Sequence, residues 1–401
     1  MRKDKIFKKE NKKISSNIWK FYLANFFREW MFIIPVVVLF WQENGLSLTQ
    51  IMLLQALFAL SIVAFEVPTG VIADKLGRKQ SMIFGSFFLI AGSMIYGFGH
   101  NFFQFFIAEA IWGIGACFFS GADTALVYDS LKQTKREKDF KKILGNAKSW
   151  GYLAAGISGI IGGFVAVYSM RVNWFLTAIG MFLLLFIVLL YKEPKHFEKL
   201  QEKNYWKHTK ESFKDAFDNK NILFLLLFYS LLAVIARISL WFYQPYLKAA
   251  GWDIVYFGMI WATFTIFAIS GSKFAHNIEK YLGVSRSLWL MIIISTFSII
   301  FMGYWFALFG LIFIYMQQFL RGFNGPVLSA YTNQHLSSEK RATLLSIQSF
   351  SGNLLFVIVG PAFGWIADTF TLKVALIFTG VIFFVAFSSL MIWNWRRNKL
   401  K

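Results

Sequence analysis

Long apolar segments, each of about 20 residues or more, follow one another along almost the whole chain. A helix needs about 20 predominantly apolar residues to cross the hydrocarbon core of a bilayer. Apolar residues make up 57% of the chain and charged residues only 15%, which is more apolar surface than a water-soluble fold can bury. The sequence therefore predicts an all-α integral membrane protein with 12 transmembrane helices. The segments lie at about residues 18–41, 48–70, 81–99, 102–128, 149–169, 173–191, 221–247, 254–276, 287–304, 306–331, 343–367 and 371–394.

The basic residues are distributed unevenly between the connections. The chain has 41 Lys and Arg against 21 Asp and Glu, a net charge of +20. With the N-terminus placed inside, 35 of the 41 basic residues fall on the inner side, and only Arg171, Lys248 and Lys373 fall outside. Cytoplasmic connections carry the excess of Lys and Arg, so both termini are expected in the cytoplasm. Topology and contact with anionic lipid head groups thus explain the charge, and no nucleic acid partner is expected.

A long charged connection divides the chain into halves. Residues 192–220 form a cytoplasmic linker between an N-terminal part, 1–191, and a C-terminal part, 221–401. Shifting the second half back by 206 positions places Gly251 on Gly45 and aligns residues 278–284 with the similar residues 72–78. Internal repeats of this kind relate the halves of many transporters. We therefore expect two pseudo-symmetric six-helix bundles.

Charged residues occur inside the apolar segments at a regular interval. They lie in the first, fourth, seventh and tenth segments, whereas the third, sixth, ninth and twelfth carry none in their membrane portions. A charge inside a span is costly and usually faces a cavity or a partner. A three-helix repeat whose first helix faces a central polar cavity explains the interval; alternatively, the charges only pair to hold helices together. The residues are Arg28, Glu29, Glu109, Asp123, Arg237 and Arg321, with Glu66 near the inner end of the second segment.

Polar and aromatic side chains share helix faces with these charges. Residues at i, i+3, i+4 and i+7 lie on one face of a helix. Asn25 lies one turn before Arg28, and Gln317 and Asn324 flank Arg321 at this spacing. We therefore expect a substrate cavity lined by Asn25, Arg28, Trp112, Arg237, Gln244, Gln317, Arg321 and Asn324.

Four carboxyl groups are candidates for proton coupling: Glu29, Glu66, Glu109 and Asp123. Pairing with the three arginines of the spans leaves one of them over. A carboxylate without a partner in a low-dielectric site is easier to protonate, as a proton carrier near neutral pH requires. Glu29 is the expected carrier, close to a bend expected near Pro35. Glu109 and Asp123 lie about 21 Å apart on one continuous helix and are expected to act separately.

The connection between segments 48–70 and 81–99 carries the pattern G-x-x-A-D-[RK]-x-G-R-[RK]. Glycines permit tight turns and close helix approach, and the basic residues keep the connection inside. This pattern resembles the signature loop of the major facilitator superfamily, and the six-plus-six organisation extends the resemblance over the whole chain. The fixed positions are Gly70, Ala73, Asp74, Gly77 and Arg78.

The resemblance implies a conformational lock on the cytoplasmic side. The family pattern implies that Arg78 pairs with Asp129 and that Asp74 meets the helix start at residues 341–343. Residues 65–70 and 120–131 resemble a bacterial, drug-exporter-like branch. Glu109 stands where the family's proton-coupling pattern has an arginine, so coupling schemes that use that arginine do not transfer.

Taken together, these features predict a secondary active transporter that works by alternating access, a proton-coupled exporter of small amphipathic organic molecules. Proton-coupled uptake of a polar nutrient and flipping of a lipid-linked substrate are the alternatives. No Walker A, H-E-x-x-H or G-x-S-x-G pattern occurs, so neither an enzyme nor direct use of ATP is expected. We expect no metal and no cofactor. The partners expected are a small-molecule substrate, protons and lipid, for a monomer in the plasma membrane of a bacterium.

Overall fold

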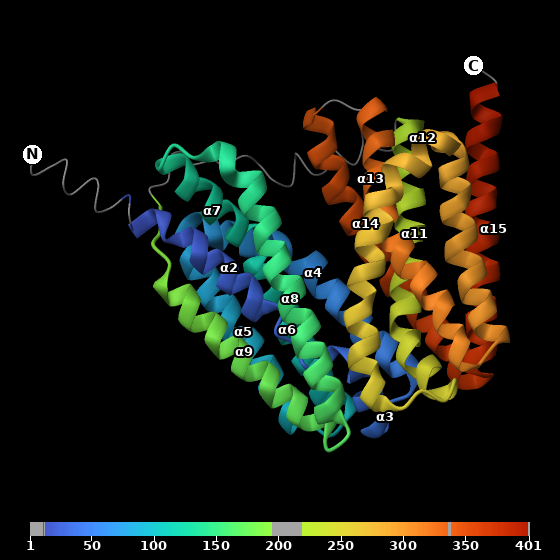
Figure 1. Ribbon diagram of the computed structural model, residues 1–401, viewed down its shortest axis with the longest axis horizontal. Helices are drawn as coiled ribbons and strands as arrows, with labels where there is room; N and C mark the ends of the chain where they lie inside the picture. The colour runs from blue at the N-terminus through green and yellow to red at the C-terminus, as the bar shows by residue number, and fades with distance from the viewer. Residues whose placement is uncertain (1–10, 12, 195–218, 336–337, 400–401) are drawn as a thin grey trace, which may run out of the picture. The chain divides into compact units, whose positions relative to one another are not determined.

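The computed structural model describes residues 11, 13–194, 219–335 and 338–399, and every regular element in this part is a helix (Figure 1). Most of the expected linker, 192–220, lies outside the described residues. The helices are α2 (Asn17–Arg28), η1 (Ile34–Val36), α3 (Val37–Glu43), α4 (Leu48–Leu76), α5 (Arg78–Phe98), α6 (Phe102–Phe119), α7 (Ala122–Gln133), η2 (Glu137–Asp139), α8 (Phe140–Ala166), α9 (Met170–Leu190), α11 (Lys220–Ala249), η3 (Ile254–Tyr256), α12 (Phe257–Tyr304), η4 (Leu308–Gly310), α13 (Leu311–His335), α14 (Ser338–Thr369) and α15 (Leu372–Lys399).

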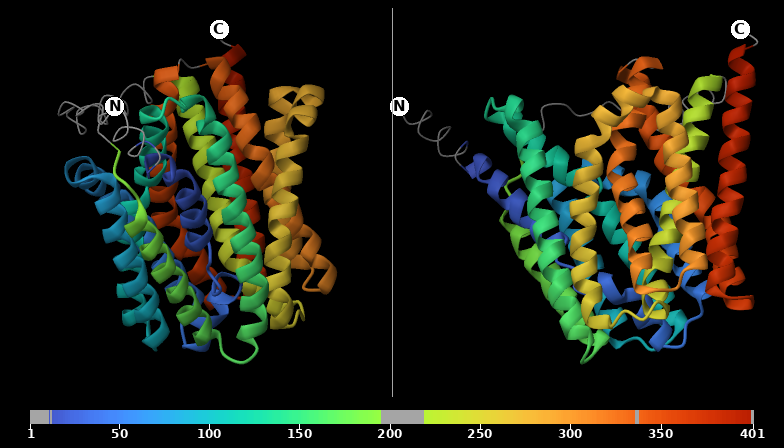
Figure 2. Two further views of the ribbon diagram at one scale, coloured as in Figure 1. Left: turned by 60° about the vertical axis from the view of Figure 1, so that its left-hand side comes forward. Right: turned by 45° about the vertical axis from the view of Figure 1, so that its right-hand side comes forward.

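Nine helices in the described part are long and apolar enough to cross a membrane. The expected segments 254–276 and 287–304 both lie on α12, which Gly283 interrupts with φ 73° and ψ 167°. Figure 2 shows the chain reversing direction within α12. The all-helical membrane architecture predicted from the sequence is confirmed.

The chain divides into two compact units. The first consists of residues 1–40, 57–201 and 254–262, and it contains α2 and α5 to α9. The second consists of residues 41–56, 202–253 and 263–401, and it contains α11, most of α12, and α13 to α15. Helix α4 begins in the second unit and continues in the first from Leu57.

The first apolar segment is broken rather than continuous. Helix α2 ends at Arg28, and a short turn precedes η1, in which Pro35 occupies the first turn. Proline has no amide hydrogen, so it is tolerated at a helix start, and its ring disfavours a helix that continues from the residues before it. The expected bend near Pro35 is therefore a break over residues 29–33. The break leaves Glu29 at the C-terminal end of α2.

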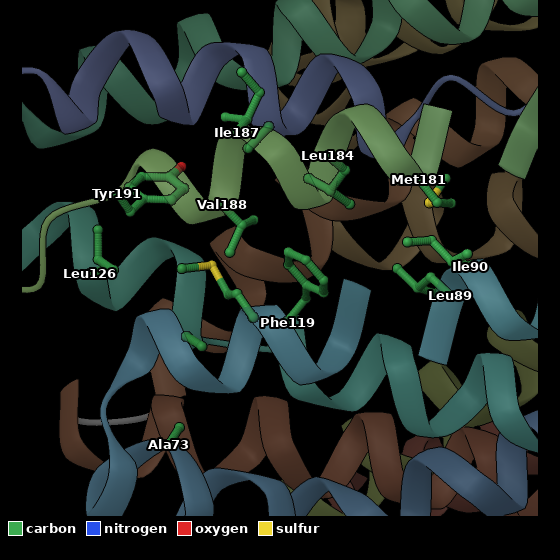
Figure 3. Close-up of a cluster of buried hydrophobic side chains, with 13 residues drawn as sticks. Ala73, Leu89, Ile90, Phe119, Leu126, Met181, Leu184, Ile187, Val188 and Tyr191 are labelled. Carbon is green, nitrogen blue, oxygen red and sulfur yellow. The ribbon is translucent and has the colours of Figure 1, made fainter. Parts of the chain in front are cut away.

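A buried apolar cluster holds the first unit together (Figure 3). Leu184 and Val188 of α9 pack with Leu89 of α5, Phe119 of α6 and Leu126 of α7, and all five are at most 4% exposed. Side chains buried in this way bring about 1.5–3 kcal/mol each in water, but in lipid the packing contacts themselves carry the association of helices. The cluster fixes how α5, α6, α7 and α9 lie around the polar residues described below.

Helix α4 begins with an acidic cap supplied from far along the chain. Within the second unit, Asp368 at the end of α14 accepts hydrogen bonds from the amides of Leu48, at 2.9 Å, and Thr49, at 2.7 Å. The Thr49 hydroxyl also donates to it, at 2.5 Å. The first amides of a helix lack partners within the helix and carry a partial positive charge, which a carboxylate satisfies.

Candidate functional site

A cavity of about 480 Å³ in the first unit is lined mainly by α2, α6, α7 and α8, with one residue each from α4, α5 and α9. Of the residues predicted for the substrate cavity and for proton coupling, five line it: Asn25, Arg28, Glu29, Trp112 and Asp123. Lys148 adds a second cation. Ser120, Gly121 and Thr124 also line it, and apolar and aromatic side chains form the rest of its wall: Phe21, Met31, Phe58, Leu89, Ala116, Phe119, Leu144 and Met181.

An ion pair crosses this cavity. The Arg28 guanidinium donates to the Asp123 carboxylate at 2.7 Å and to the Asn25 side-chain oxygen at 3.0 Å. The side chain of Asp123 is only 9% exposed, whereas that of Arg28 is 32% exposed. Charge-assisted bonds of this length are the strong ones, and removing one partner leaves the other charge poorly compensated. Asp123 is therefore held in place by Arg28 across the cavity.

A glycine in the left-handed conformation places Asp123. Helix α6 ends at Phe119, and α7 begins after Gly121, which has φ 75°. A residue with a Cβ atom is strained in this conformation, so glycine suits the position. Asp123 thus lies in the first turn of α7, where the amide of Thr124 donates to its carboxylate at 2.5 Å.

Glu29 lines the same cavity without a bonded partner. Its half-buried carboxylate forms no hydrogen bond or salt bridge with another residue in the described part of the chain. Gly151 of α8 lies against it, because a Cβ atom at position 151 would be 3.1 Å from Glu29 Cγ. The small residue in α8 therefore makes room for the Glu29 side chain beside the Arg28–Asp123 pair.

Glu109 lies away from this cavity. It is 7% exposed and accepts a hydrogen bond from the Tyr96 hydroxyl, and the Tyr96 ring stacks on Trp174 with centroids 4.1 Å apart. The sequence predicts Glu109 and Asp123 on one continuous helix, but Gly121 separates α6 from α7. The structure therefore separates Glu109 from Asp123.

A second cavity, of about 360 Å³, lies among α11, α12 and α13 of the second unit. Four of the predicted residues line it: Arg237, Gln317, Arg321 and Asn324. Gln244 is buried and is not among the lining residues. The Arg237 guanidinium donates to the Asn353 side-chain oxygen at 2.8 Å and lies over the Phe356 ring, 5.0 Å from its centroid.

The signature motif is almost entirely helical. Gly70 lies inside α4, with open space where a Cβ atom would be, and only Gly77, with φ 103°, separates α4 from α5. The carboxylate of Glu193 accepts from the first amides of α5, those of Arg78 at 3.0 Å and Lys79 at 2.8 Å. One glycine therefore makes the turn, and an acidic cap supports the helix that follows.

Arg78 donates to the Asp129 carboxylate in a salt bridge between α5 and α7, as the family resemblance implies. Asp74 is exposed on α4, and the side chains at 341–343 lie outside the described residues. Glu66 is also exposed on α4 and lines neither cavity. No group of three or more His, Cys, Asp or Glu that could hold a metal ion occurs among the described residues.

Several residues that contact the predicted site residues were not predicted from the sequence. Glu193 and Lys148 lie at the ends of apolar segments, where charges are common, so nothing in their local pattern marks them. Gly151 is one of 29 glycines in the chain. Tyr96 is one of 15 tyrosines, and only the tertiary fold places it against Glu109.

Apolar spanning helices enclose two cavities that carry charged side chains, and a family match identifies the chain as a membrane transport protein rather than an enzyme. A family model described as Major Facilitator Superfamily matches residues 21–316, and the chain belongs to this family. It is a multi-pass protein of the bacterial plasma membrane, in the drug-exporter-like branch.

Two curated relatives support this assignment, and one solved structure shares the fold. Quinolone resistance protein NorA of Staphylococcus aureus (strain MRSA252) is 28% identical over 284 residues, which are 68% of this chain and 70% of that protein. Multidrug resistance protein 2 of Bacillus subtilis (strain 168) is 26% identical over 387 residues, 91% of this chain and 92% of that protein. The crystal structure of nucleoside transporter NupG shares the fold with a TM-score of 0.77 at 14% identity, over 93% of this chain and 98% of that chain.

Proposed function

We propose that this transporter exports small amphipathic organic molecules in exchange for protons, by alternating access. The cavity of the first unit carries the proposal, because its apolar and aromatic wall surrounds an ion pair and a carboxylate without a bonded partner. Such a cavity suits a ligand with an apolar body and a few polar groups. The relatives named for quinolone and multidrug resistance support export of drug-like molecules.

In this proposal the two carboxylates have different tasks. Asp123 pairs with Arg28, whose guanidinium donates to it at 2.7 Å. Glu29 takes up and releases the proton, since it lines the cavity without a hydrogen bond or salt bridge to another described residue. A substrate in the cavity would compete with the proton, because it changes the solvation and the charge around Glu29. Competition of this kind makes binding of proton and substrate alternate, as antiport requires.

The proposed topology has twelve spans in two six-helix bundles, 1–191 and 221–401, with both termini in the cytoplasm and the protein a monomer. Within it, Arg78, Asp129 and Asp74 belong to a cytoplasmic lock that stabilises the outward-open state. The bond between Arg78 and Asp129 joins α5 to α7 at that end of the first unit. The positive-inside distribution of Lys and Arg supports this orientation.

Proton-coupled uptake of a polar nutrient is the second candidate. The second cavity favours it, because Gln317, Gln318 and Asn324 add amide groups to its wall. The shared fold with a nucleoside transporter is compatible with either direction of transport.

A panel of substrates tests the proposal. The purified chain is reconstituted into liposomes with an imposed pH gradient, and amphipathic drugs, nucleosides and sugars are added in turn. Export coupled to protons predicts that amphipathic compounds collapse the gradient, whereas polar nutrients do not. Collapse by nucleosides or sugars alone would favour uptake, and no collapse by any compound would refute proton coupling.

A further inference from the structure

The end of α14 holds the start of α4 by direct contact with its backbone. Asp368 accepts from the amides of Leu48 and Thr49 and from the Thr49 hydroxyl, at 2.5–2.9 Å. One turn earlier on the same face of α14, a Cβ atom at Gly364 would lie 2.7 Å from the Leu48 carbonyl oxygen and 2.8 Å from Thr49 Cα. Glycine therefore lets the two backbones meet, and the acid fixes the contact. We call these four residues the α4–α14 latch.

Two sequence features single out the α14 side of this latch. Gly364 closes the pattern G-P-x-x-G at residues 360–364, and small residues at such intervals let helices pack closely in lipid. Asp368 stands at the C-terminal end of its own helix, where the partial negative charge of that end disfavours a carboxylate. The amides at the start of α4, not α14 itself, therefore account for an acid at this position.

The start of α4 is attached to the second unit at another place as well. Trp41 of α3 packs on Trp241 of α11, with ring centroids 5.8 Å apart. Residues 41–56 group with the second unit, although α4 belongs to the first unit from Leu57 onward. All of α4 precedes the linker 192–220 in the sequence. The latch therefore holds a segment of the N-terminal half on helices of the C-terminal half.

The latch lies at the opposite end of α4 from the signature motif. Helix α4 has 29 residues, so its ends are about 43 Å apart, enough to reach both sides of a bilayer. In the proposed topology the motif is cytoplasmic, which places the latch on the outer side. The proposed lock joins Asp74, at the end of α4, to the start of α14 at 341–343. The latch joins Asp368, at the end of α14, to the start of α4.

We infer that the α4–α14 latch closes the transporter on the outer side and opens in each transport cycle. The inference rests on the proposed alternating access and adds to it the contact that the outward-open state has to break. Charge-assisted bonds to the amides of a helix start stabilise the closed state, and opening leaves those amides to water. The latch and the cytoplasmic lock stabilise opposite states, so weakening them shifts the resting population in opposite directions.

Distances between two spin labels measure the latch in the full-length chain in lipid nanodiscs, without substrate or a pH gradient. The labels are attached at Glu43→Cys and Phe370→Cys, two exposed positions beside the latch, and Cys117→Ser removes the buried native thiol. This labelled parent chain should give mainly a short distance and a minor longer one. Asp368→Ala removes all three bonds, so it should raise the ratio of long to short distance about tenfold. Asp368→Asn keeps one acceptor oxygen and should give an intermediate ratio.

Two glycines of α14 provide a matched pair of variants that leave Asp368 in place. The methyl group of Gly364→Ala would press on the backbone of α4, so this variant should also raise the ratio. A Cβ atom at Gly352 meets only Ala233 Cβ, at an ordinary 3.4 Å, so Gly352→Ala should match the labelled parent chain. The pair also keeps the inference testable if Asp368→Ala elutes as an aggregate.

The direction of the shift separates a latch from general loosening. Arg78→Ala weakens the cytoplasmic lock and should lower the ratio of long to short distance. An unchanged ratio in both Asp368→Ala and Gly364→Ala would overturn the inference, and so would an equal rise in Gly352→Ala or in Arg78→Ala. An open latch in the variants, together with no proton-driven transport by the wild type, would instead refute the proposed function and leave the latch standing.

Discussion

Replacing Gly151 by alanine tests whether α8 holds Glu29 in its working position. A methyl group there would lie 3.1 Å from Glu29 Cγ and 3.6 Å from the Asn25 carbonyl oxygen. Carbon atoms prefer separations of about 3.5–4.0 Å, so the Glu29 side chain must shift by a few tenths of an ångström. Gly156, five residues further along α8, has nothing within 4 Å of the same position. Gly156→Ala is therefore a matched control that adds the same methyl group without the contact.

The expected change in the stability of Gly151→Ala follows from two opposing contributions. Alanine stabilises a helix interior by about 0.5–1 kcal/mol relative to glycine, and both variants gain this. Crowding of a packed side chain costs about 1–3 kcal/mol, and the lower value applies because Glu29 is only half-buried. The thermal stability of Gly151→Ala should thus stay close to that of the wild type, and that of Gly156→Ala should rise. If the crowding destabilises one protonation state of Glu29 by about 1 kcal/mol relative to the other, the transport rate changes about fivefold.

The assay is substrate transport into liposomes driven by a pH gradient, with thermal unfolding of the same preparations measured in parallel. Gly151→Ala should lower the transport rate about fivefold at nearly unchanged unfolding temperature, and Gly156→Ala should transport like the wild type. Equal transport rates for the two variants would refute the idea that contact with α8 sets the position of Glu29.

Two further predictions concern the other charged pairs. Arg78→Ala breaks the bond to Asp129, which should weaken the cytoplasmic lock by about 1–2 kcal/mol and shift the resting population toward inward-open about tenfold. Labelling of introduced cysteines from the cytoplasmic side should then rise, and an unchanged labelling pattern would exclude the lock. Glu109→Gln and Asp123→Asn remove bonds to different partners. When the transport rates are converted to activation free energies, the changes in the two single variants should add up to that of the double variant within about 0.5 kcal/mol. A departure well beyond that would mean that the two carboxyl groups are coupled.

The sequence predicted the cavity residues best where a charge interrupts an apolar segment. Charges inside spans are rare because they are costly, so Arg28, Asp123, Arg237 and Arg321 were conspicuous. All four line a cavity of their own unit. The pairing of Arg78 with Asp129 was implied by the family motif, and the structure contains it.

Which partner each charge takes could not be predicted, because partners depend on breaks in helices that leave little trace in a hydrophobic pattern. The segment 102–128 is apolar throughout and predicts one helix, yet Gly121 adopts a left-handed conformation. The residues of α7 therefore do not continue the helix faces of α6. Glu109 therefore meets Tyr96, while Asp123 meets Arg28.

Long-range caps are a second kind of contact that local patterns do not reveal. Glu193 accepts from the amide of Arg78, 115 positions earlier, and Asp368 accepts from that of Leu48, 320 positions earlier. Each acid stands near the end of an apolar segment, where a charge is unremarkable. Only the packing of the helices brings it to the amides of another helix start.

Transport by Glu29→Gln tests the central claim, that Glu29 carries the proton, most directly. The variant keeps the size of the side chain and cannot release a proton, so transport driven by a pH gradient should be abolished while substrate exchange at equal pH continues. Glu66→Gln, at an exposed position of α4 outside both cavities, is the control and should transport like the wild type. Full gradient-driven transport by Glu29→Gln, together with its loss in Glu66→Gln or Asp123→Asn, would contradict the account and move the proton to another carboxylate.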